Sequence, residues 1–438
     1  MSCSKKLFFL ILFIPLLFSS CADIFHNVAD VINFVNEQNS PDPKRIFIGG
    51  DFYYTSGGVP REAFAVISEE GFIEDGFLQD PNTGLTMGSP NLGVRSIKIN
   101  NDYIYVAGLF SEYYDGAVAD PNFKILQRYT LDGQFDSSYY PAGATSGITA
   151  NPELYSIHVL DNNEVIAGGN FVTWYGASDL IKLSSDGMGN IGFTLTDGSP
   201  WIYALSTILG DSKLMVGGSI SQLGPETGLF NFAAIDLSDN TVAPSSLFPF
   251  VANMTTTRIN DFAEYSDGLY VVGTETAMFR GRLFKYNISE STVSENSVFN
   301  TSFQSNIDEV NLTGLNTVAI DSEGRIYIGG QFTNQVDDMS NVHENIMRIL
   351  PTGEIDTSFN VDLADPLVVE VHTIEIQKNG KVLVGGRFTS VNGDSDFGGF
   401  VRLKDNGEID WGFDKRDIPS GSIIYTIAIE EYPDDYAN

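Results

Sequence analysis

The stretch that decides the fold is Val382-Leu383-Val384-Gly385-Gly386, an apolar strand that ends on a pair of glycines. The same succession of apolar and then small residues recurs six more times. The other copies are Ile46-Phe47-Ile48-Gly49-Gly50, Ile104-Tyr105-Val106-Ala107-Gly108, Val165-Ile166-Ala167-Gly168-Gly169, Leu214-Met215-Val216-Gly217-Gly218, Leu269-Tyr270-Val271-Val272-Gly273 and Ile326-Tyr327-Ile328-Gly329-Gly330. Successive copies are about 49 to 61 residues apart. A period of this length is typical of a repeat architecture built from one supersecondary unit.

The last repeat defines the unit most clearly. Residues 371–376 alternate in polarity, turn at Lys378-Asn379-Gly380, and return as the strand that ends on the glycine pair. A third strand follows at 399–404, and a second turn at Asp405-Asn406-Gly407 leads into a fourth segment that ends at Phe413. We therefore predict four short strands in each repeat, with glycines where the turns require a positive φ.

Aromatic residues recur at two fixed offsets from these glycines. One lies six residues after the glycine of the second turn, and the other lies two residues after the glycine pair. We predict that both sets pack between neighbouring sheets, because aromatic side chains bury large areas. Repeats four and five depart from the pattern: Ile220 replaces the phenylalanine in repeat four, and Gly273-Thr274-Glu275 replaces the glycine pair in repeat five. The aromatics are Phe77, Tyr139, Phe193, Phe359 and Phe413 in the first set, and Phe52, Phe110, Phe171, Phe332 and Phe388 in the second.

The two ends of the repeat region complement each other. A chain of 438 residues exceeds what a single core supports, and radial stacking gives each pair of sheets its own core. The first repeat begins at its second strand, Arg45 to Gly49, and the segment from Ser422 to Glu430 matches the missing innermost strand. We predict an all-β, seven-bladed β-propeller of four-stranded blades over residues 44–432, closed by a C-terminal strand that completes blade one.

The repeat resembles a known family. Residues 384–389, Val-Gly-Gly-Arg-Phe-Thr, are followed by Arg402-Leu403 and by Gly407-Glu408-Ile409-Asp410 with Phe413. This succession, and its counterpart over residues 328–359, is similar to the delta-60 repeat of bacterial envelope proteins. The resemblance implies a propeller-like fold in a secreted or surface protein, and it implies no particular activity.

The N-terminus has the features of a lipoprotein signal peptide. Lys5 and Lys6 precede an apolar run from Leu7 to Phe18, which is too short to span a membrane. Ser19-Ser20-Cys21 then resembles a bacterial lipobox, so we predict a signal peptide over residues 1–20 and a lipid on Cys21. The alternative is an ordinary secretory signal in which this cysteine is incidental.

The predicted cellular location is the bacterial cell envelope. Ala22 after the cysteine favours the outer membrane. We interpret residues 21–43 as the lipidated N-terminus and a spacer with a short helix, which Pro41 and Pro43 end. A helix that binds a partner is the alternative. Residues 433–438 form a tail.

The charge excludes some classes of partner. The chain has 57 acidic and 24 basic residues, a net charge of −33. Such a surface repels phosphate backbones, so we expect no nucleic-acid partner and contact with the membrane only through the lipid. We expect a monomer. We also expect no disulfides, because the only cysteines are Cys3, which leaves with the signal peptide, and Cys21, which carries the lipid.

The sequence contains no recognisable catalytic or zinc motif. The four histidines include His343, which we place in a variable loop, and none has zinc-ligand spacing with another. Asp394 and Asp396 lie in Asn392-Gly393-Asp394-Ser395-Asp396, where oxygen donors alternate as they do in calcium loops. The alternative for this segment is a solvated turn. We therefore expect no cofactor other than this candidate calcium site.

The loops between second and third strands carry paired aromatics in three neighbouring repeats. We consider these six residues candidate ligand-binding groups on one rim, since flat aromatic surfaces stack on sugars and anchor protein partners. The alternative is that they pack between sheets. They are Tyr53, Tyr54, Tyr113, Tyr114, Trp174 and Tyr175.

These observations favour a non-enzymatic, lipid-anchored propeller that binds an envelope or extracellular protein or glycan through its loop-rich face. The alternative is a carbohydrate-active enzyme, a glycoside hydrolase or lyase, that uses paired carboxylates near the channel. A third interpretation is a structural component of the envelope without a discrete ligand.

Overall fold

The computed structural model describes residues 44–430, with interruptions at 57–58, 75–76, 78–82, 87–92, 101, 110–111, 116–117, 121–124, 140–152, 172–173, 175–176, 190–200, 211, 230, 245–256, 267, 276–279, 290–292, 307–310, 337–340, 396 and 414–417. The predicted signal peptide (1–20), spacer (21–43) and tail (433–438) lie outside the described residues. In the described part of the chain, no helix is both long and apolar enough to cross a membrane.

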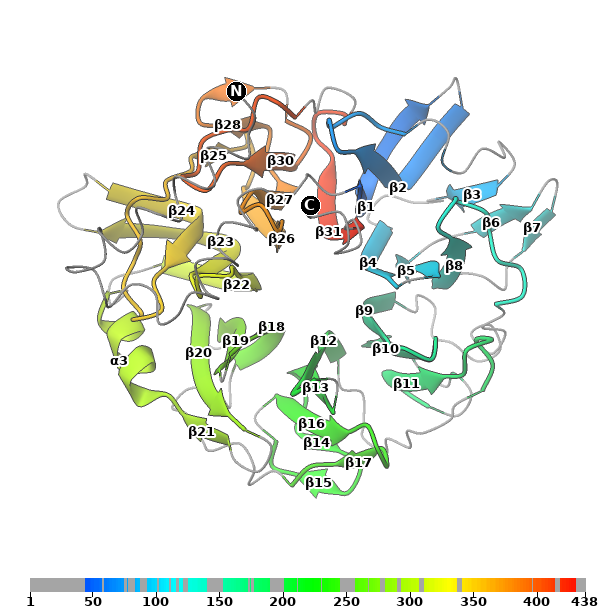
Figure 1. Cartoon of the computed structure of the whole chain (residues 1–438), viewed down its shortest axis with the longest axis horizontal. Coiled ribbons are helices and arrows are strands. Elements are labelled where there is room, and N and C mark those ends of the chain that lie inside the picture. The colour runs from blue at the N-terminus through cyan, green and yellow to red at the C-terminus, as the bar shows by residue number, and fades with distance from the viewer. Residues whose placement is uncertain are drawn as a thin grey trace, which may run out of the picture.

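Seven sheets of this described part are arranged around a common centre (Figure 1). We number them from 1 to 7 and name the strand nearest the centre first. They are sheet 1 (β31, Ile423–Glu430; β1, Arg45–Ser56; β2, Val59–Ser68), sheet 2 (β4, Gly93–Ile99; β5, Tyr103–Leu109; β8, Leu126–Thr130), sheet 3 (β9, Glu153–Val159; β10, Val165–Asn170; β11, Leu180–Leu183), sheet 4 (β12, Trp201–Ile208; β13, Lys213–Ser219; β16, Phe232–Asp236; β17, Thr241–Val242), sheet 5 (β18, Thr257–Tyr265; β19, Gly268–Glu275; β20, Arg280–Ile288; β21, Val293–Glu295), sheet 6 (β22, Asn311–Ile320; β23, Ile326–Val336; β24, Asn341–Ile349) and sheet 7 (β26, Glu370–Ile376; β27, Val382–Arg387; β30, Phe400–Leu403).

Three small sheets lie in the connections outside these seven. They are formed by β3 (Thr83–Thr86), β6 (Glu112–Asp115) and β7 (Val118–Asp120), by β14 (Gln222–Leu223) and β15 (Glu226–Thr227), and by β25 (Leu363–Ala364), β28 (Ser390–Val391) and β29 (Asp394–Ser395).

The expectation of four strands per repeat is wrong for most of the repeats whose fourth segment is described. Only sheets 4 and 5 contain a fourth strand; in sheets 1, 2, 6 and 7 the fourth segment makes a single bridge, such as Leu403 with Ile409. The reason is a local side-chain bond. Asp356 Oδ1, for example, accepts a hydrogen bond from Ser358 N at 3.0 Å, which turns the backbone away from a longer ladder.

The C-terminal strand pairs with the first strand, as the sequence predicts. β31 is antiparallel to β1 and lies on its inner side, with Arg45 opposite Glu430 and Gly49 opposite Thr426. An ion pair joins the same ends, since Arg45 Nε lies 2.5 Å from Glu430 Oε2.

Apolar cores lie between the sheets rather than in one centre. The buried apolar residues of the described chain form seven clusters, and each cluster spans one pair of neighbouring sheets. The cluster of Ile46, Leu383 and Ile424 joins sheets 7 and 1 in the way that the other six clusters join their neighbours. Each sheet therefore buries both of its faces, as radial stacking requires.

In five of the seven repeats the first residue of the small pair is a glycine, which permits this close stacking. A Cβ atom on Gly168 would lie 2.4 Å from Ile202 of the next sheet, and one on Gly329 would lie 2.5 Å from Val371. Real Cβ atoms do not approach side chains this closely, so the small residue sets how near two sheets can come.

The recurrent aromatics are core residues, as predicted, wherever their side chains are described. Edge-to-face pairs repeat between the second strand and the fourth segment: Tyr105 with Tyr139 at 5.7 Å, and Tyr327 with Phe359 at 5.3 Å. The fourth strand of sheet 5, β21, contains no aromatic residue. In this sheet the Tyr270 ring instead packs edge-to-face on Phe299, at 5.6 Å. Phe299 belongs to helix α3 (Ser297–Asn306), which the sequence pattern did not predict. The buried set comprises Phe52, Phe77, Tyr139, Phe171, Phe332, Phe359, Phe388 and Phe413.

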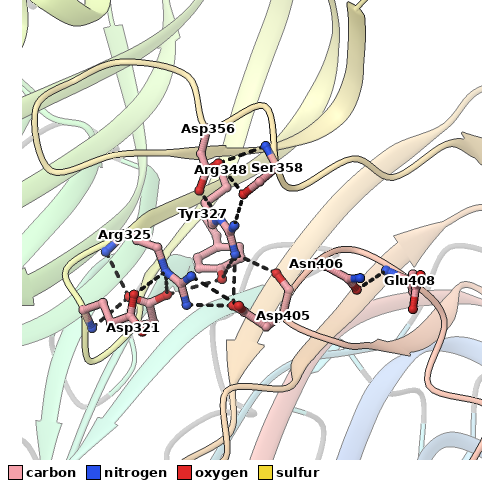
Figure 2. Close-up of polar contacts among 10 residues, drawn as sticks. Asp321, Arg325, Tyr327, Arg348, Asp356, Ser358, Asp405, Asn406 and Glu408 are labelled. Atoms are coloured by element: carbon pink, nitrogen blue, oxygen red, sulfur yellow. Dashed lines mark hydrogen bonds and ion pairs between the residues drawn. The ribbon is translucent and has the colours of Figure 1, made fainter. Parts of the chain in front are cut away.

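Buried arginines on the third strands tie each of three sheets to a turn of the next. Arg348 of sheet 6 donates to the Asp405 carbonyl of sheet 7 at 2.6 Å and to Asp356 at 2.8 Å (Figure 2). Arg128 makes the equivalent bond to the Ser185 carbonyl at 2.7 Å. Arg402 of sheet 7 reaches the Glu69 carbonyl of sheet 1 at 3.3 Å. The contact between sheets 7 and 1 therefore repeats the contact used elsewhere.

Candidate functional site

The two faces of the ring of sheets differ in their connections. In sheets 2 to 7 the inner strand runs into a short turn before the second strand, and in sheet 1 the corresponding ends are those of β31 and β1. A second short turn follows the third strand. Because neighbouring strands are antiparallel, these turns lie at one face, which we call the turn face. The longer connections after the second strands, and those between sheets, lie at the opposite face, which we call the loop face.

Every inner strand contains a β-bulge near the loop face. In sheet 2, Val94 lies opposite Gly108 and Ser96 lies opposite Ala107, so Arg95 has no partner in the ladder. The same interruption occurs in the other six sheets. Bulges re-aim side chains and are frequent beside functional sites. We call the seven bulged residues the bulge ring: Tyr425, Arg95, Tyr155, Tyr203, Asn260, Asn316 and His372.

The second glycine of each pair accommodates the bulge. A Cβ atom on this residue would lie between 1.9 and 2.2 Å from an inner-strand carbonyl oxygen in all seven sheets, for example Trp201 O beside Gly218. Only a residue without a side chain fits against that carbonyl. The motif that defines the repeat in the sequence therefore also creates the ring of bulged side chains.

The bulge ring lines a central cavity of about 460 Å³. All seven inner strands contribute to its wall. Cavities of this size suit small molecules or one end of a larger ligand.

One half of the bulge ring is aromatic and cationic. The Arg95 guanidinium lies 3.8 Å from the centre of the Tyr425 ring, and its Nε donates to Glu153 Oε1 at 2.7 Å. The Tyr155 and Tyr203 rings lie 4.8 Å apart, and Trp201 lies beside both at 6.4 and 6.1 Å. Trp201 is 42% exposed. This half therefore offers flat apolar surface to a ligand at the cavity mouth.

The other half of the bulge ring carries amides and an imidazole. Asn260 Nδ2 donates to the Leu315 carbonyl of the next sheet at 2.6 Å, and Asn316 Nδ2 donates to Glu370 Oε1 at 2.9 Å. The His372 ring lies 4.9 Å from the Tyr425 ring, so the two halves of the bulge ring contact each other at this point. Each of these side chains is held by the neighbouring sheet, so the polar groups are preorganised.

A second layer of side chains holds the backbone behind the bulges. Ser96 Oγ accepts a hydrogen bond from Ile157 N of the next sheet at 3.3 Å, and Ser156 Oγ accepts one from Leu205 N at 3.1 Å. Ala204 of sheet 4 has no such acceptor, and the amide of Phe262 bonds instead to Asp261 Oδ1 at 2.8 Å. The bulge amides named here are therefore satisfied by side chains, as buried donors require.

Three carboxylates lie along the deeper wall of the cavity, and two of them accept hydrogen bonds from backbone amides. Asp261 Oδ2 accepts from Val318 N at 3.0 Å, and Glu264 accepts from Leu209 N at 3.0 and 3.1 Å. The third is Glu375, whose carboxyl group forms no hydrogen bond or ion pair with the described residues.

Burial changes the protonation of these groups. Desolvation raises the pKa of Glu375 to about 7. The positive charge of nearby Lys98 lowers this pKa, and the negative charge of nearby Asp261 raises it. Desolvation also raises the pKa of Asp261 to about 6, against the hydrogen bonds that it accepts. Burial lowers the pKa of His372, so this imidazole is neutral at pH 7.

The aromatic rim predicted from the sequence is not assembled as expected. Trp174 is fully buried, at 5.5 Å from the Phe171 ring, and Tyr54 is buried with its hydroxyl donating to the Phe64 carbonyl at 3.1 Å. The prediction is wrong for these two residues, because the loop ends fold back into the cores between sheets. Tyr53 is 52% exposed on β1. Tyr113 and Tyr114 lie on β6 of an outer small sheet.

Tyr175, Asp396 and Cys21 lie outside the described residues, so the ligand role, the calcium role and the lipid predicted for them stay predictions. Asp394 lies exposed on β29, after a tight turn in which Asn392 and Gly393 have φ of 51 and 83°. Asn392 Oδ1 accepts from Asp362 N at 2.9 Å, so its amide holds the turn. Within the described ranges, no three histidine, cysteine or acidic residues are grouped closely enough to hold a metal.

His343 differs from its predicted place. It lies on β24 and is 3% exposed, rather than in a variable loop. The third strand of sheet 6 extends further than the strand pattern indicates, because β23 also extends beyond its glycine pair. Burial lowers the pKa of His343, so it is a neutral core residue at pH 7.

A sequence signal for the bulge ring does exist. In six of the seven sheets the bulged residue is followed by a small or hydroxyl-bearing residue and then by an apolar core residue, as in Arg95-Ser96-Ile97, Tyr155-Ser156-Ile157 and His372-Thr373-Ile374. The alternating polarity of these segments predicts plain strands, and alternation alone does not reveal a bulge.

Comparison with known proteins supports the fold. A family model described as "Domain of unknown function (DUF5122) beta-propeller" matches residues 322–359 and 377–413, in sheets 6 and 7. No curated protein matches the sequence.

Several solved structures match this chain at low sequence identity. The chain is 12% identical to a hypothetical selenium-binding protein from Sulfolobus tokodaii, with 90% of this chain and 94% of that one covered and a TM-score of 0.47. It is 12% identical to a quinonprotein alcohol dehydrogenase-like protein from Bacteroides thetaiotaomicron, with 87% and 79% covered and a TM-score of 0.38.

The extracellular domain of a putative one component system from B. thetaiotaomicron is 13% identical, with a TM-score of 0.32. The match covers 88% of this chain and 47% of that one, so the chain spans about half of its length. The family match and the ring of sheets together make this chain an all-β protein with a β-propeller-like repeat.

Proposed function

We propose that the chain is a closed seven-bladed β-propeller, held on the bacterial cell envelope by a lipid on Cys21, and that it binds a glycan without catalysis at the bulge ring. The closed ring is supported by the pairing of β31 with β1 and by the apolar cluster between sheets 7 and 1. The lipobox of the sequence supports the anchor and the outer-membrane address.

The observation that carries the glycan proposal is the position of Trp201. This half-exposed tryptophan packs beside Tyr155 and Tyr203, and these two tyrosines line a polar cavity on the loop face. Sugar rings present apolar C–H faces and many hydroxyls, so they fit a site that pairs flat aromatics with fixed amide and guanidinium groups. A protein partner would bind a broader, flatter surface, and its binding is an outcome that the experiment below separates.

The test is a glycan array probed with the secreted, unlipidated Cys21→Ser chain. We expect binding to a restricted set of glycans, and a loss of about tenfold or more in affinity for Trp201→Ala, as for aromatic anchors in binding sites. Trp411→Ala is the matched control, since Trp411 is also exposed but lies near the turn face. Binding only to an envelope protein, with equal affinity in both variants, would reject the glycan proposal.

The catalytic alternative depends on Glu375. A carboxyl with a pKa of about 7 is suited to general acid catalysis at neutral pH. The array-selected glycan should remain intact during long incubation with the wild-type chain if the protein only binds. Cleavage that Glu375→Gln abolishes would instead establish the enzyme.

A further inference from the structure

We propose that the turn face of sheets 7 and 1 rests on the lipid surface that carries the anchor, with Phe72 and Trp411 in contact with the headgroup region. This inference rests on the proposed lipid at Cys21. It assigns a second interaction surface to the protein, and it sets the direction in which the bulge ring faces.

The described chain begins at the turn face. Lys44 N donates to the Glu430 carbonyl at 2.9 Å, and Arg45 lies opposite both Glu430 and Ser68, the last residues of their strands. Ser68 begins the short turn that follows β2, the third strand of sheet 1. Residues 21–43 therefore connect the lipidated cysteine to the turn face, beside the junction of sheets 1 and 7.

Two large exposed side chains lie at this same junction. Phe72 is 50% exposed and Trp411 is 64% exposed. Arg402 joins the two segments that carry these side chains, because it donates to the Glu69 carbonyl at 3.3 Å and to Asp410 Oδ2 at 2.9 Å. Trp411 directly follows Asp410, and Phe72 follows the turn that contains Glu69.

The corresponding positions of other repeats are mostly polar. Where sheet 1 has Phe72, sheets 2 and 6 have Gln134 and Glu354, and where sheet 7 has Trp411, they have Ser137 and Thr357. Sheet 3 has Met188 at the position of Phe72, and this side chain is apolar and 52% exposed but not aromatic. Among the described residues at these two positions, an exposed aromatic occurs only at this junction. Tryptophan and phenylalanine at a surface suit the boundary between water and lipid, where one side of the ring is apolar and the other is wet.

The junction is also close to neutral in a strongly acidic chain. Its charged residues form ion pairs, such as Lys44 with Glu430 at 3.1 Å, Lys381 with Asp410 at 3.2 Å and Lys404 with Glu408 at 3.0 Å. The whole chain has a net charge of −33, which repels phosphate headgroups. A nearly neutral surface can approach lipid at a lower electrostatic cost than the net charge of the whole chain would suggest. Its basic residues are Lys44, Arg45, Lys378, Lys381, Arg402 and Lys404, and its acidic residues are Glu69, Glu70, Glu74, Asp405, Glu408, Asp410 and Glu430.

This orientation has a consequence for the glycan site. The bulge ring lies at the loop face, on the opposite side of the ring of sheets from Lys44. Contact through the turn face therefore directs the cavity mouth and Trp201 away from the membrane, toward ligands outside it.

The test uses the three tryptophans of the lipidated full-length chain in phosphatidylcholine vesicles that contain brominated lipid. Trp174 is buried and serves as a constant background. Trp201→Phe leaves Trp411 as the exposed reporter, and Trp411→Phe leaves Trp201. We expect brominated lipid to quench Trp411 emission severalfold more strongly than Trp201 emission.

Each alternative outcome decides a different point. Quenching of Trp201 but not of Trp411 would reverse the orientation and overturn the inference. Vesicle-bound protein in which neither tryptophan is quenched would show that the spacer holds the propeller off the surface, which also overturns it. Wild-type protein that fails to bind vesicles, with Cys21 unmodified by mass spectrometry, would reject the anchor itself and this inference with it, while the array experiment would still decide the glycan site.

Discussion

Arg95 stacks on Tyr425 at 3.8 Å, and this contact joins the second sheet to a strand contributed by the C-terminal end of the described chain. Because both residues belong to the bulge ring, the candidate site is complete only when β31 is paired with β1. The architecture and the site therefore depend on the same strand, and experiments on one inform the other.

The ion pair at the junction of the chain ends should be energetically coupled. Arg45 and Glu430 are 11% and 13% exposed at the side chain. A double-mutant cycle with Arg45→Ala and Glu430→Ala, measured by urea unfolding, should give a coupling free energy of about 1 to 2 kcal/mol. A coupling of zero would mean that β31 is not held beside β1 in solution.

Alanine at the second glycine of a pair should be strongly destabilising. In Gly330→Ala the new Cβ would lie 2.1 Å from the Gly314 carbonyl, so the bulge must shift. We expect a loss of about 3 kcal/mol or more in unfolding free energy. Gly412→Ala is the control, because its nearest contact is at 3.3 Å, and it should cost less than about 1 kcal/mol. Equal costs at the two positions would contradict the role given to the glycine.

The buried arginines should contribute far more to the unfolding free energy than exposed ion pairs do. Arg348 is 2% exposed and bonds to Asp356, Tyr327 and Asp405 (Figure 2), so Arg348→Ala should lower the unfolding free energy by about 3 to 5 kcal/mol. Lys404→Ala removes a pair between side chains that are 50% and 63% exposed, and should cost less than about 1 kcal/mol. Thermal unfolding of the two variants distinguishes these expectations.

Glu375 should make the protein less stable as the pH rises. Its folded pKa of about 7 exceeds the ordinary value of 4.5, so the folded state binds more protons than the unfolded state between these values. Unfolding free energy from this group therefore falls as the pH rises from about 4.5 to 7. Glu375→Gln should gain on the order of 2 kcal/mol over wild type on going from pH 4.5 to pH 8. A constant difference between the two proteins over this range would refute the assignment.

Sequence periodicity was sufficient to predict the positions of the second strands, the pairing of β31 with β1 and the burial of the recurrent aromatics. These features follow from local patterns that each repeat restates, such as Val382 to Gly386. The periodicity could not predict that Phe299 of α3 would replace a fourth-segment aromatic, because this contact depends on tertiary packing.

The candidate site was harder to predict for a related reason. Trp174 and Trp201 are both tryptophans near strand ends at the loop face, yet one is fully buried and the other half-exposed. Exposure is decided by how the neighbouring sheet packs, which a single sequence does not state. The bulge that aims Tyr203 into the cavity is similarly invisible to an alternating pattern.

The most direct test of glycan binding at the bulge ring is the emission of Trp201 itself. In the unlipidated Trp411→Phe chain, Trp201 is the exposed tryptophan, because Trp174 is buried. Titration with the array-selected glycan should give a saturable change in emission at the same midpoint as calorimetric binding. Calorimetric binding with unchanged Trp201 emission would place the glycan elsewhere and contradict the account.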